Sequence, residues 1–136
     1  MKTVLVVDAS VLVVVLADDG ADGDQARVRL RGEHVVLPEL ADLEVASVLR
    51  RQIRVGAIDD RRARLALDDL AAMPAQRAPH RPLLGRCWEL RDNLTIYDAA
   101  YVALAEAMRG TLLTGDGRLA DAPGPRCTIE VFQPER

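Results

Sequence analysis

The sequence predicts an α/β domain of three layers, with helices on both faces of a central sheet of four or five parallel strands. Short apolar runs alternate with longer helical segments, which is typical of β–α–β units. The first run, residues 3–7, is continuously apolar and predicts a strand buried on both faces. Apolar residues make up 49% of the 136 residues, but only four are aromatic, so the stacking side chains of an RRM-like RNA-binding sheet are missing.

Local signals give the remaining elements. We expect helices over residues 10–17, 22–31, 38–55, 59–73, 82–93 and 96–108, and strands over 34–37, 75–80, 111–114 and 128–132. Pro38 should open its helix, where a missing N–H does no harm, and Gly56 and Gly110 should each end one. No repeat or linker divides the sequence, so residues 1–136 are expected to form a single domain.

The apolar N-terminal stretch, residues 3–16, needs its own explanation. Asp8 interrupts it, Asp18 and Asp19 follow it, and it is too short to span a bilayer. A signal peptide would need a longer basic segment and a cleavage site of small residues. We therefore expect a strand that turns into a helix, no membrane association, and a cytoplasmic location.

Charge and cysteine content exclude little. The net charge of −3 gives no hint of nucleic-acid binding, and Lys2 is the only lysine. The cysteines and histidines lack the spacing of metal ligands. Arginine clusters suit phosphate but also occur on solvated helix faces, and both interpretations stay open. The cysteines are Cys87 and Cys127, and the histidines are His34 and His80. The arginine clusters are Arg50, Arg51 and Arg54, and Arg61, Arg62 and Arg64.

Two aspartates directly follow predicted strands. Asp8 stands after the first strand, where it is either a helix N-cap or a ligand. Asp116 lies in a Gly-Asp-Gly turn after residues 111–114, and Asp121 is a possible helper. Because ligands of parallel sheets bind outside the carboxyl ends of the strands, we expect Asp8 and Asp116 to meet at one edge.

Two further carboxylates lie on predicted helices. Glu44 shares a stripe with Leu40 and Val48, so it should face the interior, where a charge is costly without a partner. An interior salt bridge to an arginine is the alternative explanation. Asp98 falls at the third position of a helix capped by Thr95, where it favours the helix dipole, but the helix behind it is apolar on every side.

Gathered at one edge, such carboxylates repel one another by roughly 3 kcal/mol for each pair at about 5 Å and an effective dielectric near 20. A hard divalent cation, Mg²⁺ or Mn²⁺, relieves this repulsion because it prefers oxygen ligands. A bound dication can activate water and stabilise charge on a phosphodiester. The carboxylates thus predict metal-dependent phosphoester hydrolysis.

The same segments resemble the motifs of PIN domains, above all those of VapC-type toxins of type II toxin–antitoxin systems. The motifs run through nearly the whole chain and read VDAS at residues 7–10, EVASVL at 44–49, TIYDAAYVALA at 95–105 and LTGDGRL at 113–119. The third and fourth, about twelve residues apart, are the most specific. The first two are weak singly but strong in this order and spacing.

The resemblance implies a PIN fold and endonucleolytic cleavage of RNA. It assigns Asp8 and Asp98 as principal metal ligands, with Glu44 and Asp116 completing the catalytic pocket. Ser10 and Thr114 would hold the carboxylates or a water. It further implies a homodimer and inhibition by a VapB-type antitoxin whose C-terminal segment covers the site.

Several alternatives remain open at this point. A receiver domain or a haloacid-dehalogenase-type phosphatase also places an aspartate after its first strand, but both need a lysine from a later strand. A PIN-fold RNA-processing nuclease outside a toxin–antitoxin pair is one alternative, and a non-enzymatic PIN-fold binding module is another. The RNA and its cleavage sequence, and the number of metal ions, do not follow from the sequence.

Overall fold

A computed structural model describes residues 3–134. Its five strands are all parallel and lie in the order β3-β2-β1-β4-β5. The strands are β1 Val4–Val7, β2 His34–Pro38, β3 Gln76–Ala78, β4 Thr111–Thr114 and β5 Thr128–Val131. The α/β class, the parallel sheet and the positions of all five strands are therefore confirmed.

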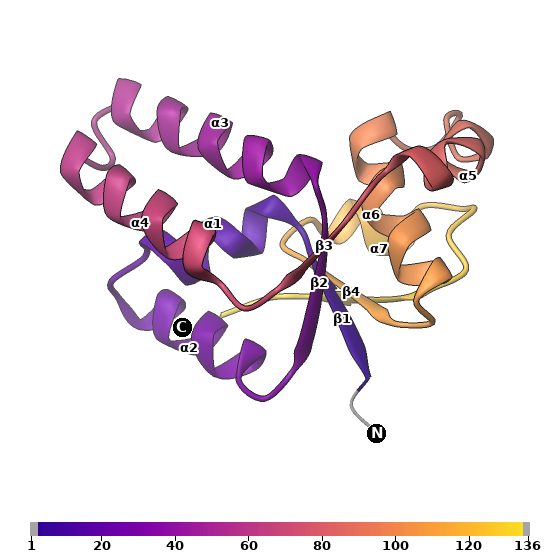
Figure 1. Cartoon of the computed structure of the whole chain (residues 1–136), viewed down its shortest axis with the longest axis horizontal. Coiled ribbons are helices and arrows are strands. Elements are labelled where there is room, and N and C mark those ends of the chain that lie inside the picture. Colours follow the sequence, from indigo (N-terminus) through magenta and orange to yellow (C-terminus); the bar gives the residue numbers. More distant parts are fainter. Residues whose placement is uncertain (1–2, 135–136) are drawn as a thin grey trace.

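Helices cover both faces of the sheet, which Figure 1 shows nearly edge-on, with α1 to α4 on one side and α5 to α7 on the other. This is the predicted three-layer arrangement. The helices are α1 Ala9–Ala17, α2 Ala21–Leu30, α3 Leu40–Arg54, α4 Asp60–Ala72, α5 Leu84–Glu89, α6 Ile96–Ala107 and α7 Gly117–Asp121, with a 3₁₀ turn, η1, at Arg81–Leu83.

Aliphatic side chains build the core on both faces of the central strands. Leu5, Val6 and Val7 of β1 are at most 2% exposed, as expected for a strand flanked by neighbours and covered by helices on each face. Helix α6 is buried throughout its middle, residues 99–105, and packs on β1, β2 and β4. Among residues 3–134, no helix is both long and apolar enough to cross a membrane.

The predicted start of the third helix was wrong. Pro38 is the last residue of β2, paired in register with Ala78, and α3 begins at Leu40. Proline fits a strand end as well as a helix start, because the ladder continues through the N–H of Glu39, which donates to the carbonyl of Ala78 at 3.0 Å. Gly56, with φ of 77°, follows the end of α3 as expected.

Two smaller predictions also differ from the structure, and one short helix was not predicted. The helix expected over 82–93 is a 3₁₀ turn followed by α5, which ends at Glu89. Arg109, with φ of 53°, follows the end of α6, whereas Gly110 is needed for packing: a Cβ there would lie 2.4 Å from the carbonyl oxygen of Val4. Helix α7 was not predicted, since five residues are too few to show a helical period.

Candidate active site

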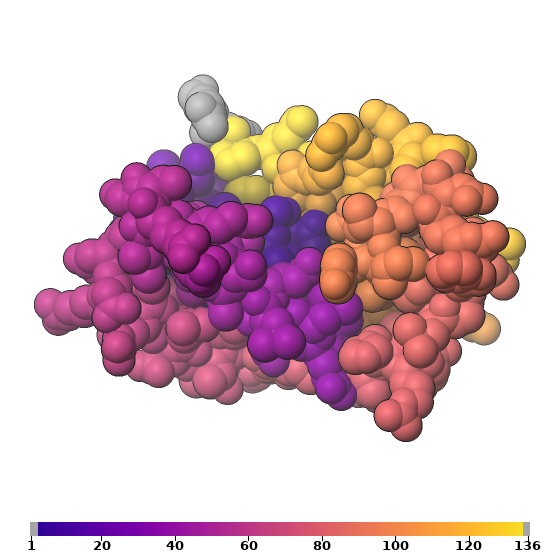
Figure 2. All heavy atoms as spheres, turned by 90° about the horizontal axis from the view of Figure 1, so that it is seen from above, coloured from indigo at the N-terminus to yellow at the C-terminus, as the bar shows by residue number. Residues whose placement is uncertain are grey.

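The strand order changes direction between β1 and β4, since the chain first adds β2 and β3 on one side of β1 and later β4 and β5 on the other. Such switch points are where parallel sheets bind ligands, outside the carboxyl ends of the strands. Figure 2 looks onto this end of the sheet. It shows the indigo start of the chain at the bottom of a hollow, between the purple and magenta part that includes α3 and the orange part that includes α6.

Asp8 lies directly after β1 at this point and is only 8% exposed. Its Oδ1 accepts hydrogen bonds from the Ser10 hydroxyl at 2.5 Å and the Val11 N–H at 3.3 Å, and its Oδ2 accepts from the Thr114 hydroxyl at 2.5 Å. Asp8 is therefore both the N-cap of α1 and a buried carboxylate. Burial raises its pKa, although these hydrogen bonds oppose the shift.

Two backbone N–H groups orient the hydroxyls that hold Asp8. Gly115 N–H donates to Ser10 Oγ at 3.0 Å, and Asp116 N–H donates to Thr114 Oγ1 at 3.0 Å. Because each hydroxyl oxygen already accepts a hydrogen bond, its own proton is directed to the carboxylate. The loop after β4 thus fixes the orientation of Asp8.

Glu44 reaches the same region from α3. It is half-buried, and its Oε1 accepts a hydrogen bond from the Tyr101 hydroxyl at 2.6 Å. No arginine pairs with Glu44 among the described residues, so the interior salt bridge is not formed. Burial raises the pKa of Glu44, and the charges of Asp98 and Asp8 raise it further. The face is only half-buried, since Leu40 and Val48 of the same stripe are half-buried as well.

Asp98 enters from the first turn of α6. Its backbone N–H donates to the Thr95 hydroxyl at 3.1 Å, which confirms the predicted cap. Burial is the main cause of its raised pKa, and the negative charges of Asp8 and Asp116 add to it. Asp98 therefore interacts with carboxylates from two different strand ends.

Asp116 differs from the other three carboxylates. It caps α7 and accepts two hydrogen bonds from the Arg118 guanidinium, at 3.2 Å from Nε and 3.3 Å from Nη2, besides the Arg118 backbone N–H at 3.0 Å. These contacts lower its pKa. Asp121 ends the same helix and is exposed. It is not among the charges that shift the pKa of Asp98, so nothing here assigns it a role.

The chemistry of these side chains suits a hard dication, since every donor is a carboxylate or hydroxyl oxygen. Within residues 3–134, however, no three His, Cys, Asp or Glu side chains converge closely enough to hold an ion. Three of the four carboxylates have side-chain partners: Asp8 accepts from Ser10 and Thr114, Glu44 accepts from Tyr101, and Asp116 accepts from Arg118.

A cleft of about 290 Å³ lies beside Asp98 and Asp116. Its walls come from the loop before α6 and from α7, and its lining residues are Asn93, Leu94, Thr95, Asp98, Asp116, Arg118, Leu119 and Ala122. The cleft gives a ligand access to the carboxylate site from one side.

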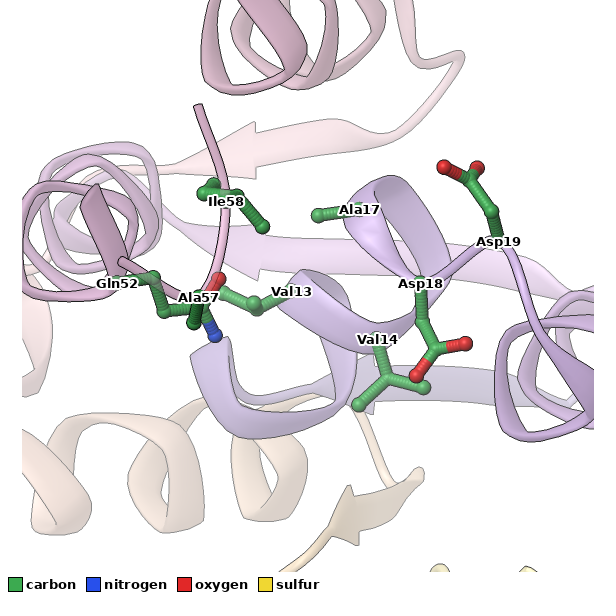
Figure 3. Close-up of a pocket in the computed structure, with 8 residues that line it drawn as sticks. All are labelled: Val13, Val14, Ala17, Asp18, Asp19, Gln52, Ala57 and Ile58. Carbon is green, nitrogen blue, oxygen red and sulfur yellow. The ribbon is translucent and has the colours of Figure 1, made fainter. Parts of the chain in front are cut away.

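A separate pocket of about 330 Å³ lies between α1 and the turn after α3 (Figure 3). Asp18 and Asp19 stand at its rim, but both have partners. Asp18 Oδ1 accepts the N–H groups of Gly20 and Gly23, and Asp19 pairs with Arg62 at 2.9 Å. We therefore locate the chemistry at the sheet edge and not in this pocket.

The remaining groups singled out in the sequence lie elsewhere. Cys87 is a buried free thiol, Cys127 is a half-buried one, and both histidines are exposed. Arg62 and Arg64 form ion pairs on the protein's own surface, and Arg50, Arg51, Arg54 and Arg61 are exposed. Sequence reasoning missed Tyr101 and Arg118. Tyr101 follows Asp98 by three residues within the apolar middle of α6, which was the available signal.

Comparisons with known proteins agree with this geometry. The PIN domain family matches residues 5–125. Ribonuclease VapC1 of Mycobacterium tuberculosis is 46% identical over 129 residues, which cover 94% of this chain and 97% of that protein. Ribonuclease VapC9 of the same organism is 44% identical over 130 residues, with coverage of 93% and 97%.

The crystal structure of VapBC2 from Rickettsia felis, bound to a DNA fragment from the promoter, superimposes with a TM-score of 0.70 at 11% identity. That match covers 96% of this chain and 99% of that one, and it is a likeness of fold alone. From the sequence matches we conclude that the chain belongs to the PIN-domain family, among its VapC ribonucleases.

Proposed function

We propose that this protein is a metal-dependent endoribonuclease, the toxin of a VapBC-type pair, and that it hydrolyses RNA phosphodiester bonds at the site around Asp8. One observation carries the proposal. Carboxylates from four distant segments lie around the switch point of the sheet, where burial raises the pKa values of Glu44 and Asp98 and the neighbouring negative charges add to both shifts. A fold maintains such repulsion when a cation or a proton relieves it in the working state.

The metal proposal assigns Asp8, Glu44, Asp98 and Asp116 as ligands of Mg²⁺ or Mn²⁺. An ion bound there supplies an activated water and neutralises charge on the phosphodiester. Ser10 and Thr114 hold both oxygens of Asp8, so this carboxylate is already fixed in orientation. Tyr101 orients Glu44 with a neutral hydroxyl, which leaves the negative charge of Glu44 available.

The proposed partners are RNA, a VapB-type antitoxin and a second copy of this chain, all in the cytoplasm. The names of the relatives, VapC ribonucleases and a VapBC complex, support RNA and an antitoxin. Exposed apolar side chains on α3 and α4 offer a surface that a partner chain would bury. They are Leu43, Ile53, Leu65 and Leu67, which are 36–76% exposed.

Cleavage of end-labelled RNA, with and without Mg²⁺ or Mn²⁺, tests the proposal. The Asp98→Asn variant should lose more than about 100-fold in rate, since even changes to residues around metal ligands cost 10–100-fold. Asp68→Asn is the matched control, because Asp68 is an exposed aspartate on α4. Equal cleavage by wild type and Asp98→Asn, or undiminished cleavage in EDTA, would show that the metal-site assignment is wrong.

The same experiments separate the alternatives. A binding module would bind Mn²⁺ and RNA without cutting. An RNA-processing nuclease outside a toxin–antitoxin pair would also cut RNA. Expression of a toxin would stop growth, and co-expression of the adjacent small gene would restore it, whereas an RNA-processing nuclease would not show this pattern. Sequencing the 5′ ends of RNA fragments after induction would identify the cleaved RNA.

A further inference from the structure

Arg118 places a positive charge at the carboxylate site, and its contribution to the stability of the fold does not explain why it is there. Its hydrogen bonds to Asp116 lower the pKa of that carboxyl, and its charge also acts on Asp98. Its side chain is nevertheless 93% exposed, so it contributes little to the core. An exposed ion pair of this kind adds little stability, which leaves its position beside the carboxylates to be explained.

The contact between Arg118 and Asp116 is loose in comparison with the other arginine pairs of the protein. Its two distances are 3.2 and 3.3 Å. The ion-pair distances of the other described arginines run from 2.6 Å for Arg29 with Glu130 to 3.1 Å for Arg77 with Asp42. Charge-assisted N–H···O bonds are usually about 2.7–2.9 Å long. The guanidinium of Arg118 can therefore leave Asp116 at small cost.

The cleft beside Arg118 has walls of opposite charge. Its lining residues include the acidic Asp98 and Asp116, the basic Arg118, and the polar Asn93 and Thr95. A phosphodiester that approaches the carboxylates is repelled by them, whereas a guanidinium fork matches two phosphate oxygens. Arg118 is thus the group in this cleft that can attract an RNA backbone.

We propose that Arg118 is a substrate-positioning residue that rests on Asp116 in the free protein and moves to a phosphate of the RNA strand when the strand enters this cleft. The inference rests on the RNA-cleaving function proposed above. Arg118 and a metal ion would compete for the carboxylate oxygens of Asp116. Binding of the metal would therefore release the guanidinium beside the place where the RNA phosphate would bind.

Binding measurements on Arg118→Gln test the proposal. With Ca²⁺ in place of Mg²⁺ and a short single-stranded RNA, its Kd should rise about tenfold, which corresponds to about 1.4 kcal/mol. The slope of log K against log salt should fall by roughly 0.7, the value for one phosphate contact on a single strand. Arg118→Lys should keep the slope because it keeps the charge. The matched control is Arg64→Gln, which removes an arginine that is 77% exposed and paired with Asp60 on α4, and it should change neither quantity.

Mn²⁺ binding without RNA distinguishes positioning of substrate from positioning of Asp116. Arg118→Gln should bind Mn²⁺ as tightly as wild type or more tightly, because a competitor for Asp116 is gone. Weaker Mn²⁺ binding would show that Arg118 acts by holding Asp116, and would overturn the proposal. Unchanged RNA affinity and salt slope, in a protein that cuts RNA, would overturn it while the nuclease function stands. If wild type neither binds nor cuts RNA, both proposals fail.

Discussion

The hydroxyl of Thr114 offers the sharpest test of how the site is built. Thr114 is fully buried, donates to Asp8 Oδ2 at 2.5 Å and accepts the Asp116 N–H at 3.0 Å. Thr114→Val replaces the hydroxyl by a methyl of similar size. The substitution therefore removes two hydrogen bonds without leaving a cavity.

The expected loss of stability follows from these two bonds. A hydrogen bond to a charged group contributes about 1.5–3 kcal/mol, and one between neutral groups about 0.5–1.5 kcal/mol. Burial of the added methyl returns roughly 1 kcal/mol. We expect a net loss of about 2 kcal/mol at pH 7, or roughly 6 °C in Tm. Mn²⁺ affinity should also fall by about 10–100-fold, because Asp8 loses its orientation.

Thermal unfolding in EDTA and Mn²⁺ titration measure these two effects. Thr111→Val is the matched control, since Thr111 lies on the same strand, is half-buried and changes in the same way. It should stay within about 0.5 kcal/mol of wild type. If Thr114→Val unfolds at the same temperature as Thr111→Val and binds Mn²⁺ normally, the hydroxyl does not hold Asp8 and the reasoning is refuted.

Two further predictions concern pH and packing. Burial raises the pKa of three site carboxylates, so the native state takes up protons before the unfolded chain does. In EDTA the Tm should therefore rise as the pH falls from neutral toward about 4, which is the pKa of carboxyl groups in the unfolded chain. Asp98→Asn should make this rise smaller. A steady fall in Tm over that pH range would contradict the argument. Gly110→Ala should lose about 1–3 kcal/mol in urea unfolding, because its Cβ would meet the Val4 carbonyl at 2.4 Å. Gly117→Ala has open space and is the control, so equal stability of the two variants would refute the packing argument.

Much of the fold could be predicted because strand signals and helix caps are local. The continuous apolar run of β1 and the capping side chain of Thr95 act within a few residues, and the structure has them as expected. Pro38 shows the limit of such signals. Whether it ends a strand or opens a helix depends on the pairing of β2 with β3, and residues forty positions apart make that contact.

The positions of the carboxylates could be predicted for a related reason. Parallel strands carry their C-terminal residues to one edge, so Asp8 and Asp116 were expected at the same edge. The pairing of β1 with β4 then makes them neighbours. The partners could not be predicted in the same way. The contact of Glu44 with Tyr101 joins two helices that are 57 residues apart in sequence. The contact of Arg118 with Asp116 depends on a side-chain rotamer, which the sequence does not encode locally.

The side-chain hydrogen-bond partners of the buried carboxylates are neutral hydroxyl groups, and this supports a cation-binding role more strongly than any other feature of the site. Elsewhere in the protein, Arg86 forms an ion pair with Glu106 and neutralises its charge. An arginine beside Glu44 would have done the same and would have filled the space that a metal ion needs. Tyr101 instead supplies a neutral hydroxyl, and Ser10 and Thr114 do the same for Asp8. Neutral donors orient a carboxylate without cancelling its charge, so the repulsion among the carboxylates persists. A site that is oriented but not neutralised has a use for a divalent cation, whereas a site built only for stability would have paired its charges.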